Sequence, residues 1–222
     1  MSTDGRFRQL SPAALEKVLH DPDLVELVKF FEPPYDKGTD SFYWPPNIRA
    51  LWEALVRSGG EDEALAEALD EQMNEVSYWY HMDPEDLQAL AASGLGLDDL
   101  PASVDFCGAK WADLHLLVTG AAWDRSQPLS SLLGTHGVGE VDVYQGGPSR
   151  VLTPGEVADA AQALASVSED EMRVRYHAAA AGARYPAALV EESGGLMDLF
   201  RQVRDHYADA WRRGNGMMVY LV

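Results

Sequence analysis

Two short segments contain residue types that often carry out chemistry. The first runs from Lys110 to His115 (KWADLH), within an apolar stretch that predicts a helix over 109–119. On that helix Trp111 and His115 are four residues apart and share a face. The imidazole could act as a general base near neutral pH, or it could be a core side chain stacked on Trp111. We favour the core role, because Asp113 lies on a different side of the helix and cannot orient the ring.

The second segment runs from Tyr144 to Arg150 (YQGGPSR). A Gly-Gly-Pro turn that presents an arginine could bind a carboxylate or phosphate through two parallel hydrogen bonds. The alternative is a structural arginine that ties the turn to carbonyl groups or to a core carboxylate. The candidate ligand-binding residues are Lys110, Trp111, His115, Tyr144 and Arg150, and no residue is assigned a catalytic role.

The motifs that identify common enzyme classes are absent from the sequence. It contains no GxxxxGK[ST], no strand-GxGxxG-helix, no HExxH, no GxSxG and no 12-residue calcium loop. Cys107 is the only cysteine, which excludes an internal disulfide and a multi-cysteine zinc site. The histidines outside the two segments lack metal-ligand spacing. We therefore expect neither a cofactor nor a metal.

The charge balance excludes two classes of partner. With 17 basic and 36 acidic side chains the net charge is −19, and the pI is near 4.5. Binding to nucleic-acid phosphates or to anionic lipids requires cations, so we expect no nucleic acid and no membrane partner. No stretch approaches 18 uninterrupted apolar residues, and the first residues lack an apolar signal region. These features predict a cytoplasmic protein.

The acidic residues are concentrated in one part of the chain. No Lys or Arg occurs between Arg57 and Lys110, whereas 13 acidic residues do. Such a run is usually a solvated surface. It could also attract a basic partner, and we expect any protein partner to contact region 61–99.

Hydrophobic periodicity predicts many helices and few strands. Region 61–80 reads as a helix with Leu65, Leu69, Met73, Val76 and Tyr80 on its apolar face. The proline- and aromatic-rich stretch 33–46 reads as an ordered surface loop. We expect further helices near 12–20, 24–31, 48–58, 83–93, 154–166, 169–179 and 195–213, and strands near 6–10, 138–144, 150–152 and 217–222. The fold class is therefore α+β: a single helix-rich domain with a small mixed or antiparallel sheet that includes both termini.

The block Trp111–Gly120, followed by several others in the same order, resembles the YfbM-like family of bacterial proteins of unknown function. Trp111–Gly120 (WADLHLLVTG) is similar to the family's W-x-x-L-H-x-L-L-T-G block, and Tyr144–Val157 is similar to its Y-G-P-x-R-x-L-T-P-x-E-V block. The beginning, Gly5–Pro12, and the end, from Tyr207 into Met217–Leu221, also match. The resemblance implies one compact α+β domain over 1–222 and no known activity. Residues 33–60 look like a family-atypical insert.

The sequence thus favours a protein that binds another protein and performs no catalysis. An accessory or immunity-like protein that neutralises a basic toxin is one form of this prediction. The alternative is a small-molecule-binding protein or enzyme with a pocket around His115, Tyr144 and Arg150.

Overall fold

The protein forms two compact units in this computed structural model, which describes residues 5–36, 41–76, 82–101, 103–106, 136–142, 147–181 and 193–221. Arg8–Ser103 with Val138–Val141 contain 21 acidic and 6 basic side chains, so we call them the acidic unit. Met1–Phe7, Val104–Gly137 and Asp142–Val222 make up the second unit. The single domain over 1–222 stays a prediction.

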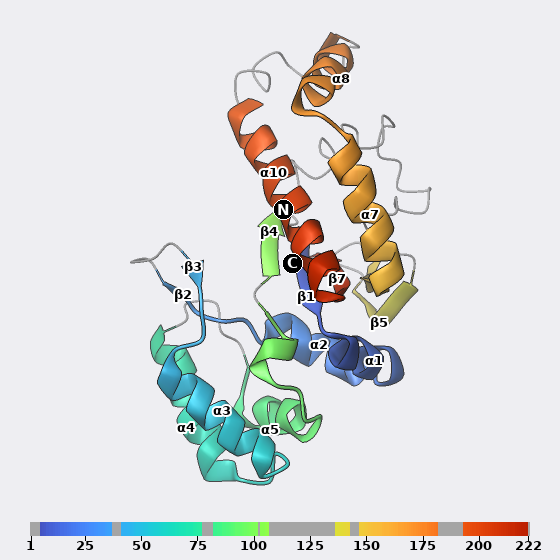
Figure 1. Ribbon diagram of the computed structural model, residues 1–222. Coiled ribbons are helices and arrows are strands. Elements are labelled where there is room, and N and C mark those ends of the chain that lie inside the picture. Colours follow the sequence, from blue (N-terminus) through green and yellow to red (C-terminus); the bar gives the residue numbers. More distant parts are fainter. Residues whose placement is uncertain are drawn as a thin grey trace. The chain divides into compact units, whose positions relative to one another are not determined.

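A five-stranded sheet contains strands from both ends of the chain (Figure 1). Its strand order is β4-β1-β7-β6-β5. β6 and β7 are antiparallel, with Val151 opposite Met218 and Leu152 opposite Met217. The predicted α+β class and the inclusion of both terminal strands are confirmed. The strands are β1 (Gly5–Leu10), β4 (Ser103–Phe106), β5 (His136–Asp142), β6 (Gly147–Leu152) and β7 (Gly216–Leu221).

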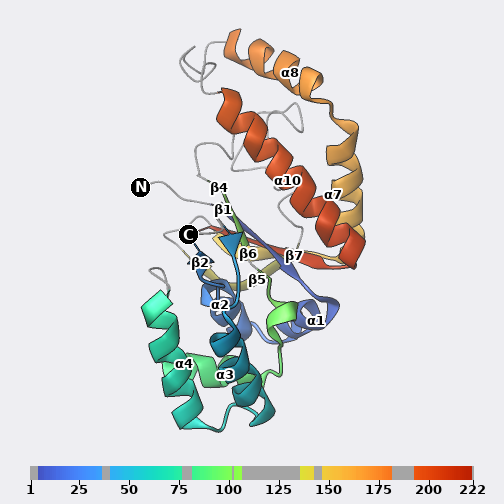
Figure 2. The ribbon, with the colours of Figure 1, turned by 60° about the vertical axis from the view of Figure 1, so that its left-hand side comes forward.

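The acidic unit is built mainly from short helices. Ser11 begins the first of them by accepting a hydrogen bond from Ala14 N, with Pro12 at the first helical position. α3 and α4 run side by side and α5 packs against both (Figures 1 and 2). The elements are α1 (Pro12–His20), α2 (Asp23–Phe30), β2 (Tyr35–Asp36), β3 (Ser41–Phe42), α3 (Pro46–Arg57), α4 (Glu63–Val76), α5 (Pro84–Ala92) and the 3-10 helix η1 (Leu97–Asp99).

Aromatic side chains form the centre of the acidic unit. The Phe31 ring contacts the rings of both Trp44 and Trp52 in a tilted arrangement, with ring centroids 4.9 and 4.5 Å away. Trp52 is fully buried, and its indole Nε1 donates to the carbonyl of Leu95, 3.1 Å away. This bond satisfies the polar end of the ring inside an apolar core.

Arg8 is the most unusual residue of this core, because its side chain is fully buried. Its guanidinium donates to the carbonyl oxygens of Val28, Phe31 (2.5 Å) and Leu100 (3.1 Å). Glu32 lies 3.6 Å from Arg8 Nη1. A buried charge is tolerated only when it is paired and hydrogen-bonded. Arg8 therefore joins β1, the end of α2 and the end of η1.

The second unit packs helices α7 (Pro154–Ser166) and α10 (Ser193–Arg213) against each other and against β7. Phe7, Leu164, Phe200 and Tyr207 are among its fully buried side chains. A capping box begins α7: Thr153 Oγ1 accepts from Glu156 N, and the Glu156 carboxylate accepts from Thr153 N. α8 (Glu169–Ala181) begins after Ser168, whose Oγ accepts from Glu171 N at 3.1 Å.

His206 on α10 is largely buried in the second unit. Burial lowers the pKa of its imidazole to about 4, against the opposing effects of the Asp209 carboxylate and a backbone hydrogen bond with Phe7. The folded state therefore keeps this ring neutral at pH values where the unfolded chain, with an ordinary pKa of 6.5, binds a proton.

We expect this difference to make the protein less stable in mild acid. Because the pKa of His206 is lower in the folded state, its burial costs no stability above about pH 6.5. The unfolding free energy then falls as the pH drops toward about 4. Between about pH 8 and about pH 5 the loss is about 2 kcal/mol of unfolding free energy. Urea unfolding at both pH values measures it. His206→Gln should abolish this loss of unfolding free energy, whereas His20→Gln on the exposed surface of α1 should not. Equal pH dependence of stability in the wild type and both variants would show that His206 is not its source.

The structure also departs from the predicted elements in places. The stretch 33–46, predicted as a loop, contains the antiparallel pair β2–β3, with Tyr35 opposite Phe42. β4 was not predicted, and Val76, placed by periodicity on an apolar face, is 43% exposed. Among the described helices, none has the length and apolar character needed to span a bilayer.

Candidate functional site

Most of the ligand-binding residues predicted from the sequence lie outside the described residues. These are Lys110, Trp111, His115 and Tyr144. Arg150 is described: it is half-buried in β6 and lies opposite Val219 of β7. The pocket hypothesis around His115, Tyr144 and Arg150 stays a prediction. Among the described residues, no three His, Cys, Asp or Glu side chains are grouped so that they could hold a metal ion.

The acidic region 61–99, in contrast, is described over most of its length and lies in the acidic unit. This unit has a net charge of −15, compared with −4 for the second unit. Its few described cations are largely engaged within the unit itself. Arg8 is buried among carbonyl groups, Lys29 pairs with Glu26 at 2.9 Å, and Lys17 donates to the Ser93 carbonyl. The excess of negative charge is therefore not balanced locally.

Helix α4 forms the most acidic part of this region. The Asp62 side chain accepts from Leu65 N at 3.1 Å in the first turn. Ala66, Leu69 and Met73 are fully buried. Asn47 of α3 donates to the side-chain oxygen of Gln72 at 2.6 Å, which joins the beginning of α3 to the last turns of α4. One face of α4 is thus fixed by packing, and the opposite face is left to solvent.

Four glutamates follow each other along the exposed side of α4 at intervals of four residues. We call Glu63, Glu67, Glu71 and Glu75 the glutamate row; all four are exposed. Residues four apart are neighbours on a helix surface, and like charges there destabilise the helix by about 0.2–0.5 kcal/mol per pair. No Lys, Arg or His within the described part of the chain forms an ion pair with the row. The spacing is visible in the sequence, but only burial shows that the whole row is exposed.

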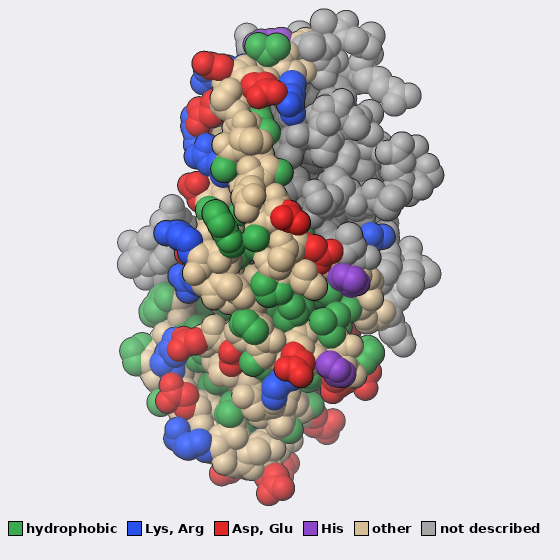
Figure 3. Space-filling view, turned by 45° about the vertical axis from the view of Figure 1, so that its right-hand side comes forward, with side chains coloured by type: hydrophobic (Ala, Val, Ile, Leu, Met, Phe, Trp, Pro, Cys, Tyr) green, Lys and Arg blue, Asp and Glu red, His purple; other side chains and the backbone are tan. Residues whose placement is uncertain are grey.

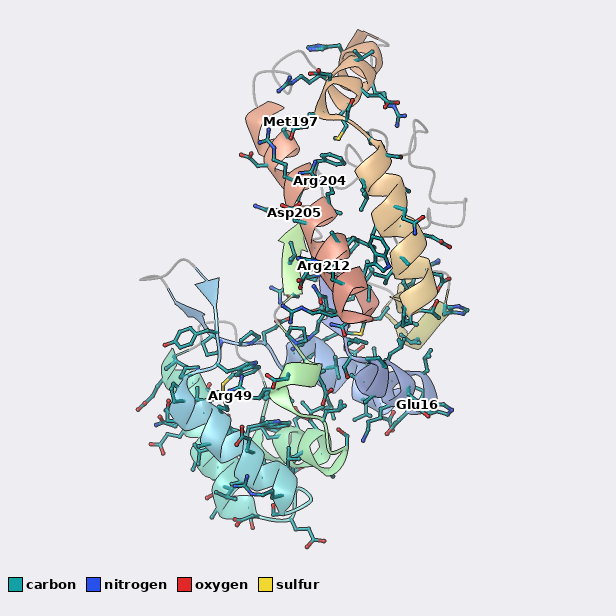
Figure 4. The ribbon with its side chains drawn as sticks, in the orientation of Figure 1. Glu16, Arg49, Met197, Arg204, Asp205 and Arg212 are labelled. Atoms are coloured by element: carbon teal, nitrogen blue, oxygen red, sulfur yellow. The ribbon has the colours of Figure 1, made fainter. Side chains whose placement is uncertain are left out.

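Other acidic residues of region 61–99 have structural roles. Asp83 and Asp86 form the capping box of α5. Asp99 accepts from the Ser11 hydroxyl at 2.5 Å and from Gly96 N at 2.8 Å. Asp98 pairs with Arg49 of α3 at 3.2 Å (Arg49 is labelled in Figure 4). Among the described residues, the glutamates of the row have neither a capping role nor an ion pair, and the side-chain hydrogen bond that involves them is that of Glu75, which accepts from Gln72 at 3.2 Å. Because they also lie on one helix face, the row is the candidate site.

The second unit has a different charge arrangement, in which arginines pair with nearby acids. Arg201 of α10 forms two parallel hydrogen bonds to Glu169 of α8, at 2.8 and 2.7 Å, and these lower the pKa of the Glu169 carboxyl. Arg212 pairs with Asp209 at 3.1 Å. Acidic and basic side chains accordingly lie beside one another in the upper part of Figure 3, at the height of α8.

We expect the repulsion within the glutamate row to be measurable as a loss of stability. Glu71→Lys replaces two repulsive pairs by two attractive ones and should raise the unfolding free energy by about 0.8–2 kcal/mol. Urea unfolding at low salt measures this gain, which should shrink in about 1 M salt. Glu16→Lys is the matched control, because exposed Glu16 on α1 (Figure 4) undergoes the same charge change with no acid three or four residues away. An equal gain in both variants would mean that only net charge matters.

Comparison with known families shows where the chain belongs. A family model described as a domain of unknown function, DUF1877, matches residues 1–220. The chain is a member of the DUF1877 family. The resemblance found in the sequence is thus confirmed, and the family description assigns no activity. Whether residues 33–60 are an insert within the DUF1877 domain stays a prediction.

A solved structure has a similar fold. The chain is similar to a protein of unknown function, YfbM from Escherichia coli, with 14% sequence identity, a TM-score of 0.50 and full coverage of both chains. At this identity the likeness concerns the fold alone. A search of curated protein sequences gave no significant match.

Proposed function

We propose that this DUF1877 protein binds another protein, and that its acidic unit contacts a basic surface on that partner. The observation that carries the proposal is the glutamate row on α4, exposed and without ion pairs among the described residues. An immunity-like protein that neutralises a basic toxin is one form of this function. The cytoplasmic location predicted from the sequence is part of the proposal.

Two physical effects support a basic partner. A net charge of −15 on one unit attracts a basic protein over a distance, which raises the association rate at low ionic strength. The second effect is local. Each glutamate of the row is repelled by its neighbours in the free protein, and lysines or arginines of a partner would relieve this repulsion on binding.

The proposal assigns neither a catalytic step nor a cofactor to the acidic unit. It also predicts no affinity for duplex DNA or anionic membranes, because the same negative charge repels phosphates. Saturable sub-micromolar binding of DNA in a low-salt gel-shift assay would contradict this part of the proposal.

The first experiment identifies the partner with matched baits. Wild-type protein, a row variant (Glu67→Lys, Glu71→Lys, Glu75→Lys) and a control variant (Glu16→Lys, Asp23→Lys, Asp159→Lys) are used to capture proteins from native lysate. The two variants have the same net charge, and all six positions are exposed. The expected result is a basic protein retained by the wild type and the control but lost by the row variant. Circular dichroism first establishes that both variants are folded.

The second experiment measures association kinetics with the purified partner. Charge reversal in the row should slow association at low salt and weaken its dependence on ionic strength, with a smaller effect in the control. If the row variant and the control associate at equal rates, overall charge explains the attraction and the row is only a solvated surface. If the wild type retains no basic protein, the pocket hypothesis takes first place.

A further inference from the structure

We draw no further inference here: the strongest candidate, the exposed apolar side chains Tyr43 and Val76 at the end of α3 and α4 that is joined by the Asn47–Gln72 hydrogen bond, carries nothing because nothing in the structure shows what covers them and the acidic side chains beside them belong to the surface already described.

Discussion

Replacing Arg8 by leucine is expected to lower the unfolding free energy by about 3–5 kcal/mol. The substitution leaves the carbonyl oxygens of Val28, Phe31 and Leu100 in a buried place without their donor. Each buried acceptor that loses its partner costs about 1–3 kcal/mol. Urea unfolding at pH 7 followed by circular dichroism measures the loss.

Two further variants distinguish the stability contributed by the buried hydrogen bonds of Arg8 from the effect of removing a positive charge. Arg8→Lys keeps the charge but lacks the planar group that reaches several acceptors, so it should recover only part of the stability. Arg49→Leu removes a guanidinium from the same unit. The Arg49 side chain is 40% exposed, and the side chain of its partner Asp98 is 91% exposed. Exposed pairs contribute about 0–1 kcal/mol, so this variant should stay close to the wild type. If Arg8→Leu and Arg49→Leu lose equal stability, Arg8 has no special role in the core.

The second large effect is expected at Gly60, in the turn between α3 and α4. Gly60 has φ +80°, and its N–H donates to the carbonyl of Leu55 at 3.0 Å, which ends α3. A Cβ at this position would lie 2.3 Å from the carbonyl oxygen of Gln88 in α5 and 3.1 Å from Ala92 N. Gly60→Ala should therefore cost about 3–4 kcal/mol, since both the backbone conformation and the contact with α5 are disturbed.

The preceding residue provides the control for this prediction. Gly59 also has a positive φ, +68°, but a Cβ there would meet no atom within 4 Å. Gly59→Ala should cost only about 1 kcal/mol, the price of the left-handed conformation. Thermal melts of the two variants measure the difference, which we attribute to the close approach of α5. Equal melting temperatures would show that α5 moves away without loss.

Stability and function are expected to conflict on α4. The glutamate row lowers the stability of the free protein, yet it is the feature that favours a basic partner. Glu71→Lys should therefore stabilise the protein and weaken partner binding at the same time. A merely solvated surface would show the first effect without the second.

The sequence by itself predicted the elements whose signals are local. The helix that begins after Ser11 and the capping box at Thr153 depend on residues three positions apart, so the sequence pattern contains them. The same holds for the strands at both ends of the chain, which the structure places in one sheet. The acidic composition of α4 and its apolar positions Leu69 and Met73 were also predicted.

Only the tertiary structure decided the features that depend on distant partners. The carbonyls that bind Arg8 lie 20 to 92 residues along the chain, so no local pattern predicts that this arginine is buried. The contact between Gly60 and Gln88 likewise exists only because α5 packs on the α3–α4 turn. Val76 has the spacing of a core residue but is exposed. Hydrophobic periodicity predicts which face of a helix is apolar, but it does not predict how much of that face a neighbouring helix covers. The Arg201–Glu169 ion pair is a further example, because it joins residues 32 positions apart and so became visible only in the tertiary structure.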